Sequence, residues 1–265
     1  MDRFDIPAGA VTLAGERRRG PGTPLVLLHA GVADRRSWRE TAMHLDGPLI
    51  AYDRRGFGDT PPSPEPFTHL ADLLAVLDAA GAPQAWLVGN SMGGALALDT
   101  ALSASERVAG LVLIATAVSG APEPDELDED TARLDAQFET AEDLDEIARL
   151  DARLWLDGPA GPEGRVGGSA RELALAMNRR ILAHEVPEDA GGSGIDAWSR
   201  LEDVAVPTTV IACALDIPAM NEQGAEVAAR VPGARSERMA GVAHLPALER
   251  PSELAALIQA STSGR

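Results

Sequence analysis

The chain has 265 residues, enough for one large α/β domain or for one domain that carries an insertion. Its net charge of −18 disfavours nucleic-acid partners, because such a surface repels phosphate backbones. No apolar run reaches the roughly 18 residues that cross a membrane, the N-terminus lacks a secretory-signal pattern, and the single cysteine, Cys213, allows no internal disulfide. We therefore expect a cytoplasmic protein without a membrane partner.

Short apolar runs alternate with helical patterns along most of the chain. Buried strands are predicted over residues 24–28, 49–52, 85–88, 111–115 and 208–212, after a small antiparallel lead-in over 4–18. Helices are predicted over residues 68–80, 92–103 and 221–230, and a last helix starts near Pro251. This alternation is typical of the α/β class, in which helices cover both faces of a mostly parallel sheet.

Residues 118–196 break the alternation, because they contain no convincing strand. Amphipathic helices are predicted first, then a Gly- and Pro-rich loop over 158–169 and another helix over 170–184. We divide the chain into a core of residues 1–117 and 197–265 and a helical cap, or lid, of residues 118–196. Between Glu123 and Asp151 lie 13 acidic residues and two arginines. We interpret them as the solvated outer face of the cap; the alternative is an entrance that repels anionic substrates.

The segment Gly89-Asn90-Ser91-Met92-Gly93 matches the pattern G-x-S-x-G. It lies between an apolar strand and a helix rich in small residues, which is the setting of a nucleophile elbow. Such a sharp turn holds the serine in an unfavourable backbone conformation, and the flanking glycines avoid collisions with the neighbouring strand and helix. We predict Ser91 as a nucleophile; the alternative is a plain Gly-rich turn.

A serine hydroxyl needs a general base, and two of the five histidines, His184 and His244, follow Ser91 in the chain. His244 lies in a loop after a predicted last strand, where catalytic residues collect, and we predict it as the base. His184 is the alternative and lies in the cap. Asp216 follows the strand 208–212 and is predicted to orient the imidazole. Its alternative is a turn carboxylate before Pro218.

The oxyanion of an acyl-transfer reaction needs backbone N–H donors. The loop His29-Ala30-Gly31-Val32 ends the first central strand, and one of its N–H groups, with that of Met92, is predicted to form an oxyanion hole. Gly31 is the first choice and Val32 the second. His29 is expected to pack or hydrogen-bond within the loop, and Cys213 to be an inert packed thiol.

Five segments together resemble α/β-hydrolases of the esterase, enol-lactonase and cofactor-free haloperoxidase group. They are Leu27-Leu28-His29-Ala30-Gly31 with Trp38, Tyr52-Asp53-Arg54-Arg55-Gly56-Phe57-Gly58, Gly89-Asn90-Ser91-Met92-Gly93-Gly94, Leu215-Asp216, and Gly241-Val242-Ala243-His244 with Glu249-Arg250-Pro251. Many relatives have His-Gly in place of His29-Ala30-Gly31, and Gly-x-Asp-Asp in place of Cys213-Ala214-Leu215-Asp216. The segment from Asp53 to Gly58 is expected to be a structural turn.

The resemblance implies a triad of Ser91, Asp216 and His244 beneath the cap, with no metal or cofactor. Trp38 and Trp155 are predicted to contact the substrate, and the apolar inner face of the cap favours an apolar acyl or alcohol group. We expect hydrolysis of a small ester or lactone through an acyl-enzyme. C–C bond hydrolysis, perhydrolysis or haloperoxidase-like activity on the same triad, and a non-catalytic ligand receptor, are the alternatives. The oligomeric state stays open.

Overall fold

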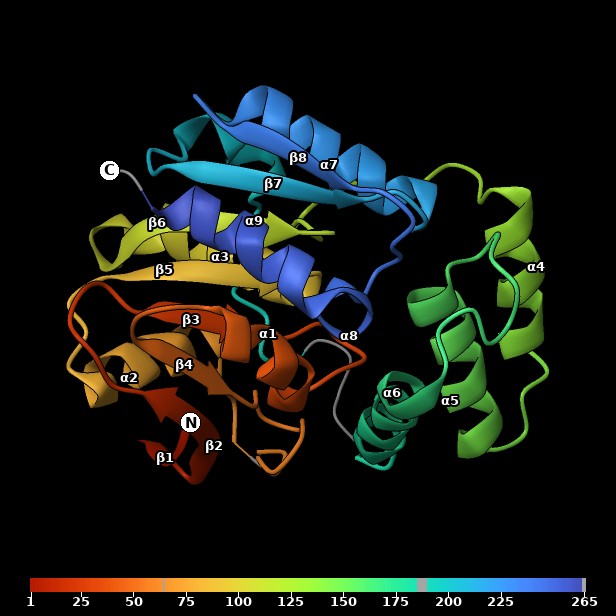
Figure 1. The fold of residues 1–265 in the computed structure, drawn as a ribbon, viewed down its shortest axis with the longest axis horizontal. Helices are drawn as coiled ribbons and strands as arrows, with labels where there is room; N and C mark the ends of the chain where they lie inside the picture. The colour runs from red at the N-terminus through yellow and green to blue at the C-terminus, as the bar shows by residue number, and fades with distance from the viewer. Residues whose placement is uncertain (64, 185–189, 264–265) are drawn as a thin grey trace.

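The computed structural model describes residues 1–63, 65–184 and 190–263. Its centre is an eight-stranded sheet with the order β1-β2-β4-β3-β5-β6-β7-β8 (Figure 1). β1 (Asp2–Ala8) and β2 (Val11–Arg18) form an antiparallel hairpin that pairs antiparallel with β4 (Leu49–Tyr52). All further pairings are parallel. β4 pairs with β3 (Leu25–Leu28), and the sheet continues, each strand pairing with the next, through β5 (Ala85–Asn90), β6 (Val108–Ile114), β7 (Thr208–Cys213) and β8 (Arg235–Met239). The predicted mostly parallel sheet and its antiparallel lead-in are confirmed.

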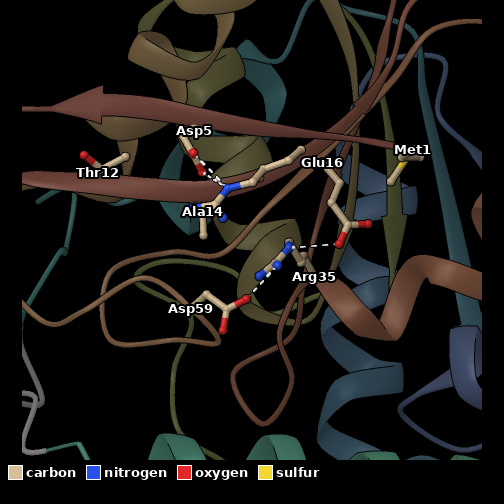
Figure 2. Close-up of a pocket in the computed structure, with 9 residues that line it drawn as sticks. Met1, Asp5, Thr12, Ala14, Glu16, Arg35 and Asp59 are labelled. Atoms are coloured by element: carbon tan, nitrogen blue, oxygen red, sulfur yellow. Dashed lines mark hydrogen bonds and ion pairs between the residues drawn. The ribbon is translucent and has the colours of Figure 1, made fainter.

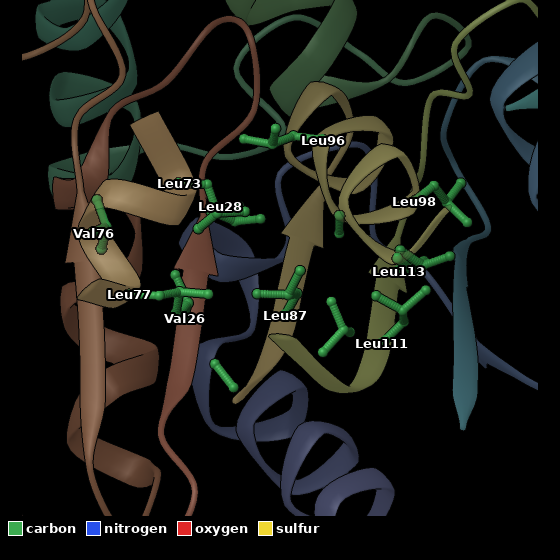
Figure 3. Close-up of a cluster of buried hydrophobic side chains, with 14 of the residues drawn as sticks. Val26, Leu28, Leu73, Val76, Leu77, Leu87, Leu96, Leu98, Leu111 and Leu113 are labelled. Atoms are coloured by element: carbon green, nitrogen blue, oxygen red, sulfur yellow. The ribbon is translucent and has the colours of Figure 1, made fainter. Parts of the chain in front are cut away.

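Alternation along the strands divides the core between the two faces of the sheet. On one face, Val26 and Leu28 of β3 join a cluster with α2 (His69–Ala80), α3 (Met92–Ser103) and α7 (Pro218–Arg230). Figure 3 shows part of this cluster between the strands and the two helices α2 and α3. On the other face, Leu25 and Leu27 pack with α1 (Arg39–His44) and α9 (Pro251–Thr262). Helices therefore cover both faces, as predicted.

The remaining short elements lie at the ends of the strands and helices. They are α8 (Pro246–Glu249) and the 3-10 turns Arg35–Trp38, Ser105–Arg107 and Trp198–Asp203. α7 begins at Pro218, three residues earlier than predicted, because proline needs no N–H bond at the first helical position. The end of α2 was predicted correctly: Gly81 follows it in the left-handed conformation, with φ of 67°.

The helices α4 (Glu129–Phe138), α5 (Leu144–Asp151) and α6 (Gly168–Leu182) lie beside the sheet, between β6 and β7 in the chain (Figure 1). A π-helical segment, Ala152–Asp157, continues α5. α6 starts and ends two residues earlier than predicted, since Gly168 tolerates its φ of 60°. In the described part of 118–196, Gly191 forms a single bridge with Thr68 and no strand is present. No described helix combines the length and apolarity that spanning a bilayer requires.

Candidate active site

Ser91 lies at the turn between β5 and α3, at the carboxyl edge of the sheet. Its φ of 55° and ψ of −119° are unusual for a residue with a side chain. The strained turn is held by its backbone: the Ser91 N–H donates to Ile114 O at 3.0 Å, and its carbonyl accepts from Gly94 N at 2.8 Å and Ala117 N at 3.3 Å. The Ser91 side chain thus stands at the end of a buried strand, where the first turn of a helix begins.

The three glycines of this turn are required by close backbone approach. A Cβ on Gly89 would collide with the backbone of Gly93, and a Cβ on Gly93 would collide with Leu28 O. A Cβ on Gly94 would collide with the side chain of Thr116. The pattern of glycines around Ser91 therefore has the steric cause that the sequence suggested.

His244 and Asp216 come from the two neighbouring loops after β8 and β7. His244 Nδ1 lies 2.7 Å from Asp216 Oδ2, and both side chains are buried. Asp216 Oδ1 also accepts from Ile217 N at 2.8 Å. The two loops are joined by a bond from Leu215 N to Val242 O at 2.9 Å. Because Nδ1 faces the carboxylate, Nε2 is the imidazole nitrogen left to face a reactant.

Asn90 connects the Ser91 turn with the His244 loop, a contact that sequence reasoning missed. Its buried side-chain Nδ2 donates to His244 O and to Ile114 O, each at 3.1 Å. No hydrogen bond joins the Ser91 hydroxyl to His244 within the described residues. The Asn90 bridge therefore ties the serine and imidazole segments together. In the sequence, only the position of Asn90 next to Ser91 could have indicated this contact, because Ile114 and His244 are 24 and 154 residues away.

The expected oxyanion donors lie around the same turn. A Cβ on Gly31 would approach Met92 Sδ to 2.5 Å, so the loop after β3 contacts the first residue of α3. Within the described residues, the backbone N–H groups of Gly31, Val32 and Met92 donate no hydrogen bond. A helix N-terminus and free N–H groups favour negative charge at this position.

The two tryptophans expected to contact a substrate lie in different surroundings. The Trp155 ring centroid is 4.5 Å from that of His244, so this indole borders the imidazole. Trp38 is only 1% exposed and packs in the core with Leu25, Leu27 and α1. Substrate contact by Trp38 stays a prediction, and the structure shows an indole whose surface is almost entirely covered by the core. Its spacing from His29 gave no information about which side of the sheet it faces.

The other histidines have local partners. His29 is buried, its Nε2 accepts from Arg54 N at 3.2 Å, and burial lowers the pKa of its imidazole well below the usual value. His184 lies beyond the end of α6, and its Nδ1 is 2.7 Å from Gly56 O. His44 ends α1 and His69 begins α2. Of the five imidazoles, the structure pairs one, that of His244, with a carboxylate at the carboxyl edge of the sheet.

The turn from Asp53 to Gly58 is structural, as expected. Buried Asp53 accepts from Arg35 N at 2.8 Å and Asp59 N at 2.7 Å, and the pKa of its carboxyl rises to about 6 through burial. A Cβ on Gly58 would collide with this carboxylate. Cys213 is buried, as expected, and burial raises its pKa.

The sequence model of the alpha/beta hydrolase family matches residues 25–257 of the chain. The chain therefore belongs to the alpha/beta hydrolase family, and it is a hydrolase. Lipase LipV of Mycobacterium tuberculosis is 31% identical over 188 residues, which make up 64% of this chain and 71% of that protein.

Solved structures of other hydrolases share this fold. A hydrolase from Pseudomonas aeruginosa PA01 superposes with a TM-score of 0.77 at 25% identity, covering 99% of both chains. A thermophilic esterase from Thermogutta terrifontis has a TM-score of 0.74 at 25% identity, covering 98% of this chain and 97% of the other. The likeness thus extends over the whole fold, including the helices between β6 and β7.

Proposed function

We propose that the protein is a serine hydrolase that cleaves a small carboxylic ester or lactone through Ser91, His244 and Asp216. The observation that carries the proposal is the 2.7 Å contact between buried His244 and Asp216, at the same edge of the sheet as the strained Ser91 turn. The relatives named as a lipase and an esterase support ester substrates.

Proton transfer follows from the tautomer of His244. With its Nδ1–H donated to Asp216, the neutral imidazole carries its lone pair on Nε2. Nε2 takes the Ser91 proton as Oγ attacks the carbonyl carbon, and Asp216 stabilises the imidazolium that forms. The imidazolium then protonates the departing alcohol. Water hydrolyses the acyl-enzyme by the same steps in reverse, which restores the Ser91 hydroxyl.

Charge on the carbonyl oxygen is stabilised by backbone donors. The Met92 N–H begins α3, so the positive end of the helix dipole lies beside the tetrahedral centre. The second donor comes from the loop after β3, either Gly31 or Val32, whose N–H groups are free of other acceptors in the described chain. One such donor is typically worth about 10²- to 10³-fold in rate.

Residues 118–196 serve as the cap of this enzyme, and residues 1–117 and 197–265 as its core. Three contacts support this division. Trp155 borders His244, Leu156 and Met177 pack in a cluster with Ala30 of the oxyanion loop, and Arg165 pairs with Glu249 at 2.7 Å. Glu249 in turn accepts from Ala243 N at 2.7 Å, next to the base. The cap therefore contacts both the loop after β3, which contains Ala30, and the segment that contains His244 and Glu249.

The proposal is tested with p-nitrophenyl esters from acetyl to octanoyl, hydrolysed by the wild type, Ser91→Ala and Ser105→Ala. Exposed Ser105 precedes β6, at the opposite edge of the sheet, and controls for the loss of a hydroxyl. We expect hydrolysis by the wild type and the control and none above background by Ser91→Ala. Equal activity of Ser91→Ala and wild type would contradict the proposal. Stoichiometric ligand binding without turnover would identify a receptor instead.

A further inference from the structure

A cavity of about 300 Å³ adjoins the nucleophile turn on the α3 side of the sheet. Two of its lining residues contact Ser91: Met92 follows it in the chain, and Ala117 donates its N–H to the Ser91 carbonyl. Helix α3 contributes one face, which runs from Met92 to Asp99. The cavity is therefore placed to hold the part of a substrate that extends away from the reacting carbonyl.

Arg54 lines this cavity and has no carboxylate partner among the residues that the structure describes. Its side chain is buried, and Nη2 donates to His29 O at 3.1 Å and Ala30 O at 3.2 Å. Nη1 makes no hydrogen bond, and no ion pair forms with Arg54 among the described residues. Burial lowers the pKa of Arg54 to about 10, so the guanidinium is still cationic at neutral pH. The Arg54 guanidinium also lies over the Phe57 ring, 4.6 Å from its centroid, but a cation–π contact supplies no counter-charge, and a buried charge without one is costly.

Other arginines show how this chain treats a buried or half-buried guanidinium. The next residue, Arg55, is buried too, and it binds Asp72 through two bonds of 2.7 and 2.8 Å. Arg35 lines a larger hollow of about 700 Å³ beside the β1–β2 hairpin, and Figure 2 shows it paired with Glu16 and Asp59. These charges are satisfied within the protein. The Arg54 charge is the exception among these three, and it faces the cavity beside Ser91.

A second donor lies beside Arg54. His69 also lines the cavity, and its Nδ1 is buried without a hydrogen-bond partner among the described residues. Burial and the neighbouring Arg54 lower the pKa of His69 to about 3, so the imidazole is neutral at pH 7 and can donate one N–H. An arginine and a neutral histidine are together suited to the two oxygens of a carboxylate.

Asp99 limits where an anion can lie in the cavity. This buried carboxylate accepts from Ser119 Oγ at 2.9 Å and Ser193 Oγ at 2.6 Å, and it lies seven residues beyond Met92 on α3. Seven helical residues correspond to about 10 Å along the axis. Arg54 lies at the other end, since it holds Ala30, and the next residue, Gly31, contacts Met92. A ligand carboxylate would therefore bind at the end nearer Ser91.

We propose that the cavity is a subsite for a substrate carboxylate, bound by Arg54 and His69, so that the preferred substrate is an ester or lactone whose acyl part ends in a carboxylate. This inference rests on the proposed ester hydrolysis at Ser91 and names its substrate class. It also differs from the apolar acyl group that the cap sequence favoured.

The test compares matched esters. Monoethyl succinate, glutarate and adipate each carry a terminal carboxylate, and ethyl butyrate, valerate and hexanoate have the same acyl lengths without it. We expect the wild type to have a higher kcat/KM for at least one monoester of a diacid than for its neutral match. Arg54→Met is expected to lower this preference about 10- to 100-fold, as loss of a charge-assisted bond does. Arg107→Met, which removes a cation paired with Asp78, is expected to leave the preference unchanged.

Arg54 also holds the oxyanion loop, so the ratio between the two substrates is the decisive quantity. An equal fall for charged and neutral esters in Arg54→Met would overturn the proposal and assign Arg54 to loop positioning alone. His69→Gln leaves the Arg54 bonds to the loop in place and provides a second variant if Arg54→Met does not fold. We expect His69→Gln to lower the preference roughly 3- to 10-fold. An unchanged preference in both variants would also overturn the proposal.

Binding without catalysis separates this inference from the proposed function. Calorimetric titration of wild-type protein with valerate and with its neutral amide, valeramide, requires no reaction at Ser91. We expect valerate to bind at least tenfold more tightly, and the difference to shrink at high salt and in Arg54→Met. Equal affinities would overturn the subsite whether or not esters are hydrolysed. Tighter binding of valerate by a protein that hydrolyses no ester would retain the subsite and reject the hydrolase mechanism.

Discussion

The carboxyl edge of the sheet and the helices between β6 and β7 differ in how they are held. At the edge, Ser91, Asp216 and His244 are all buried, and backbone and side-chain bonds join the three segments that carry them. In the insertion, no acidic residue of α4 or α5 is buried, and the buried contacts come from a few apolar side chains such as Leu134 and Leu150.

From this contrast we expect the sheet edge to determine the reaction rate and the insertion to determine stability and substrate choice. At the edge, Asp216 holds the His244 side chain through a hydrogen bond and backbone bonds hold the Ser91 turn, so substitutions there are expected to lower the reaction rate. The insertion contacts the site through Trp155 and the Arg165–Glu249 pair, so substitutions there are expected to change stability and substrate choice. The following variants challenge that division, in order of decreasing effect.

Asp216→Asn gives the largest expected effect. The amide keeps the shape of the side chain but cannot stabilise an imidazolium, and it favours the wrong His244 tautomer. We expect kcat to fall about 10⁴-fold, with little change in KM. Steady-state kinetics on a p-nitrophenyl ester measure this change. The exposed Asp203→Asn serves as the matched control. A fall of less than tenfold would mean that Asp216 does not orient the base.

Asp157→Ala tests the insertion. Buried Asp157 pairs with Arg171 at 2.8 Å and accepts from Gly164 N at 2.8 Å and Val166 N at 3.1 Å. Removing the carboxylate leaves a half-buried cation and two N–H groups without acceptors, so the free energy of unfolding should fall by about 3–5 kcal/mol. Urea denaturation measures it, with the exposed Asp145→Ala as a control that costs under about 1 kcal/mol. Equal losses in the two variants would show that Asp157 does not organise the loop.

Asn90→Ala tests whether the bridge to His244 matters for rate. Loss of the Nδ2 donor leaves His244 O without a partner among the described residues and frees the base loop. We expect kcat to fall about 10- to 100-fold with KM little changed, because misplacement of a reacting group costs rate. The pH dependence of kcat should shift as well, which a purely structural defect would not cause. Asn221→Ala on α7 is the control. Wild-type kinetics in Asn90→Ala would remove the residue from the site.

His69→Gln gives the smallest expected effect, on stability in acid. The pKa of His69 is about 3 in the folded protein and about 6.5 in the unfolded chain. Between these pH values the imidazole is protonated in the unfolded chain and neutral in the folded protein. His69 therefore costs stability as the pH falls from about 6.5 towards 3, and at pH 5 this cost is roughly 1–2 kcal/mol. Urea denaturation at pH 7.5 and pH 5 should show a smaller acid loss in the variant. Identical losses in the variant and the wild type would contradict a neutral, half-buried imidazole.

Features that depend on residues close together in the sequence could be predicted from it. The Ser91 turn, the ends of α2 and the positions of the strands from β3 to β7 follow from local steric rules and apolar runs. Contacts between distant segments were not predictable: Asn90 reaches a residue 154 positions away, and Trp38 faces the core rather than the site. Arg54 looked like its neighbour Arg55 in the sequence. Only the three-dimensional structure shows that Arg55 is paired with Asp72, whereas Arg54 has no carboxylate partner in the described part of the chain.

The most direct test of the central claim is covalent labelling with a fluorophosphonate, followed by mass spectrometry of the peptides. The reagent bonds to a serine oxygen that an adjacent base has activated. The account predicts one adduct on Ser91, no adduct in Ser91→Ala, and labelling at least 10³-fold slower in His244→Ala. An adduct on another residue, or labelling of Ser91 at the wild-type rate in His244→Ala, would contradict a nucleophile activated by His244.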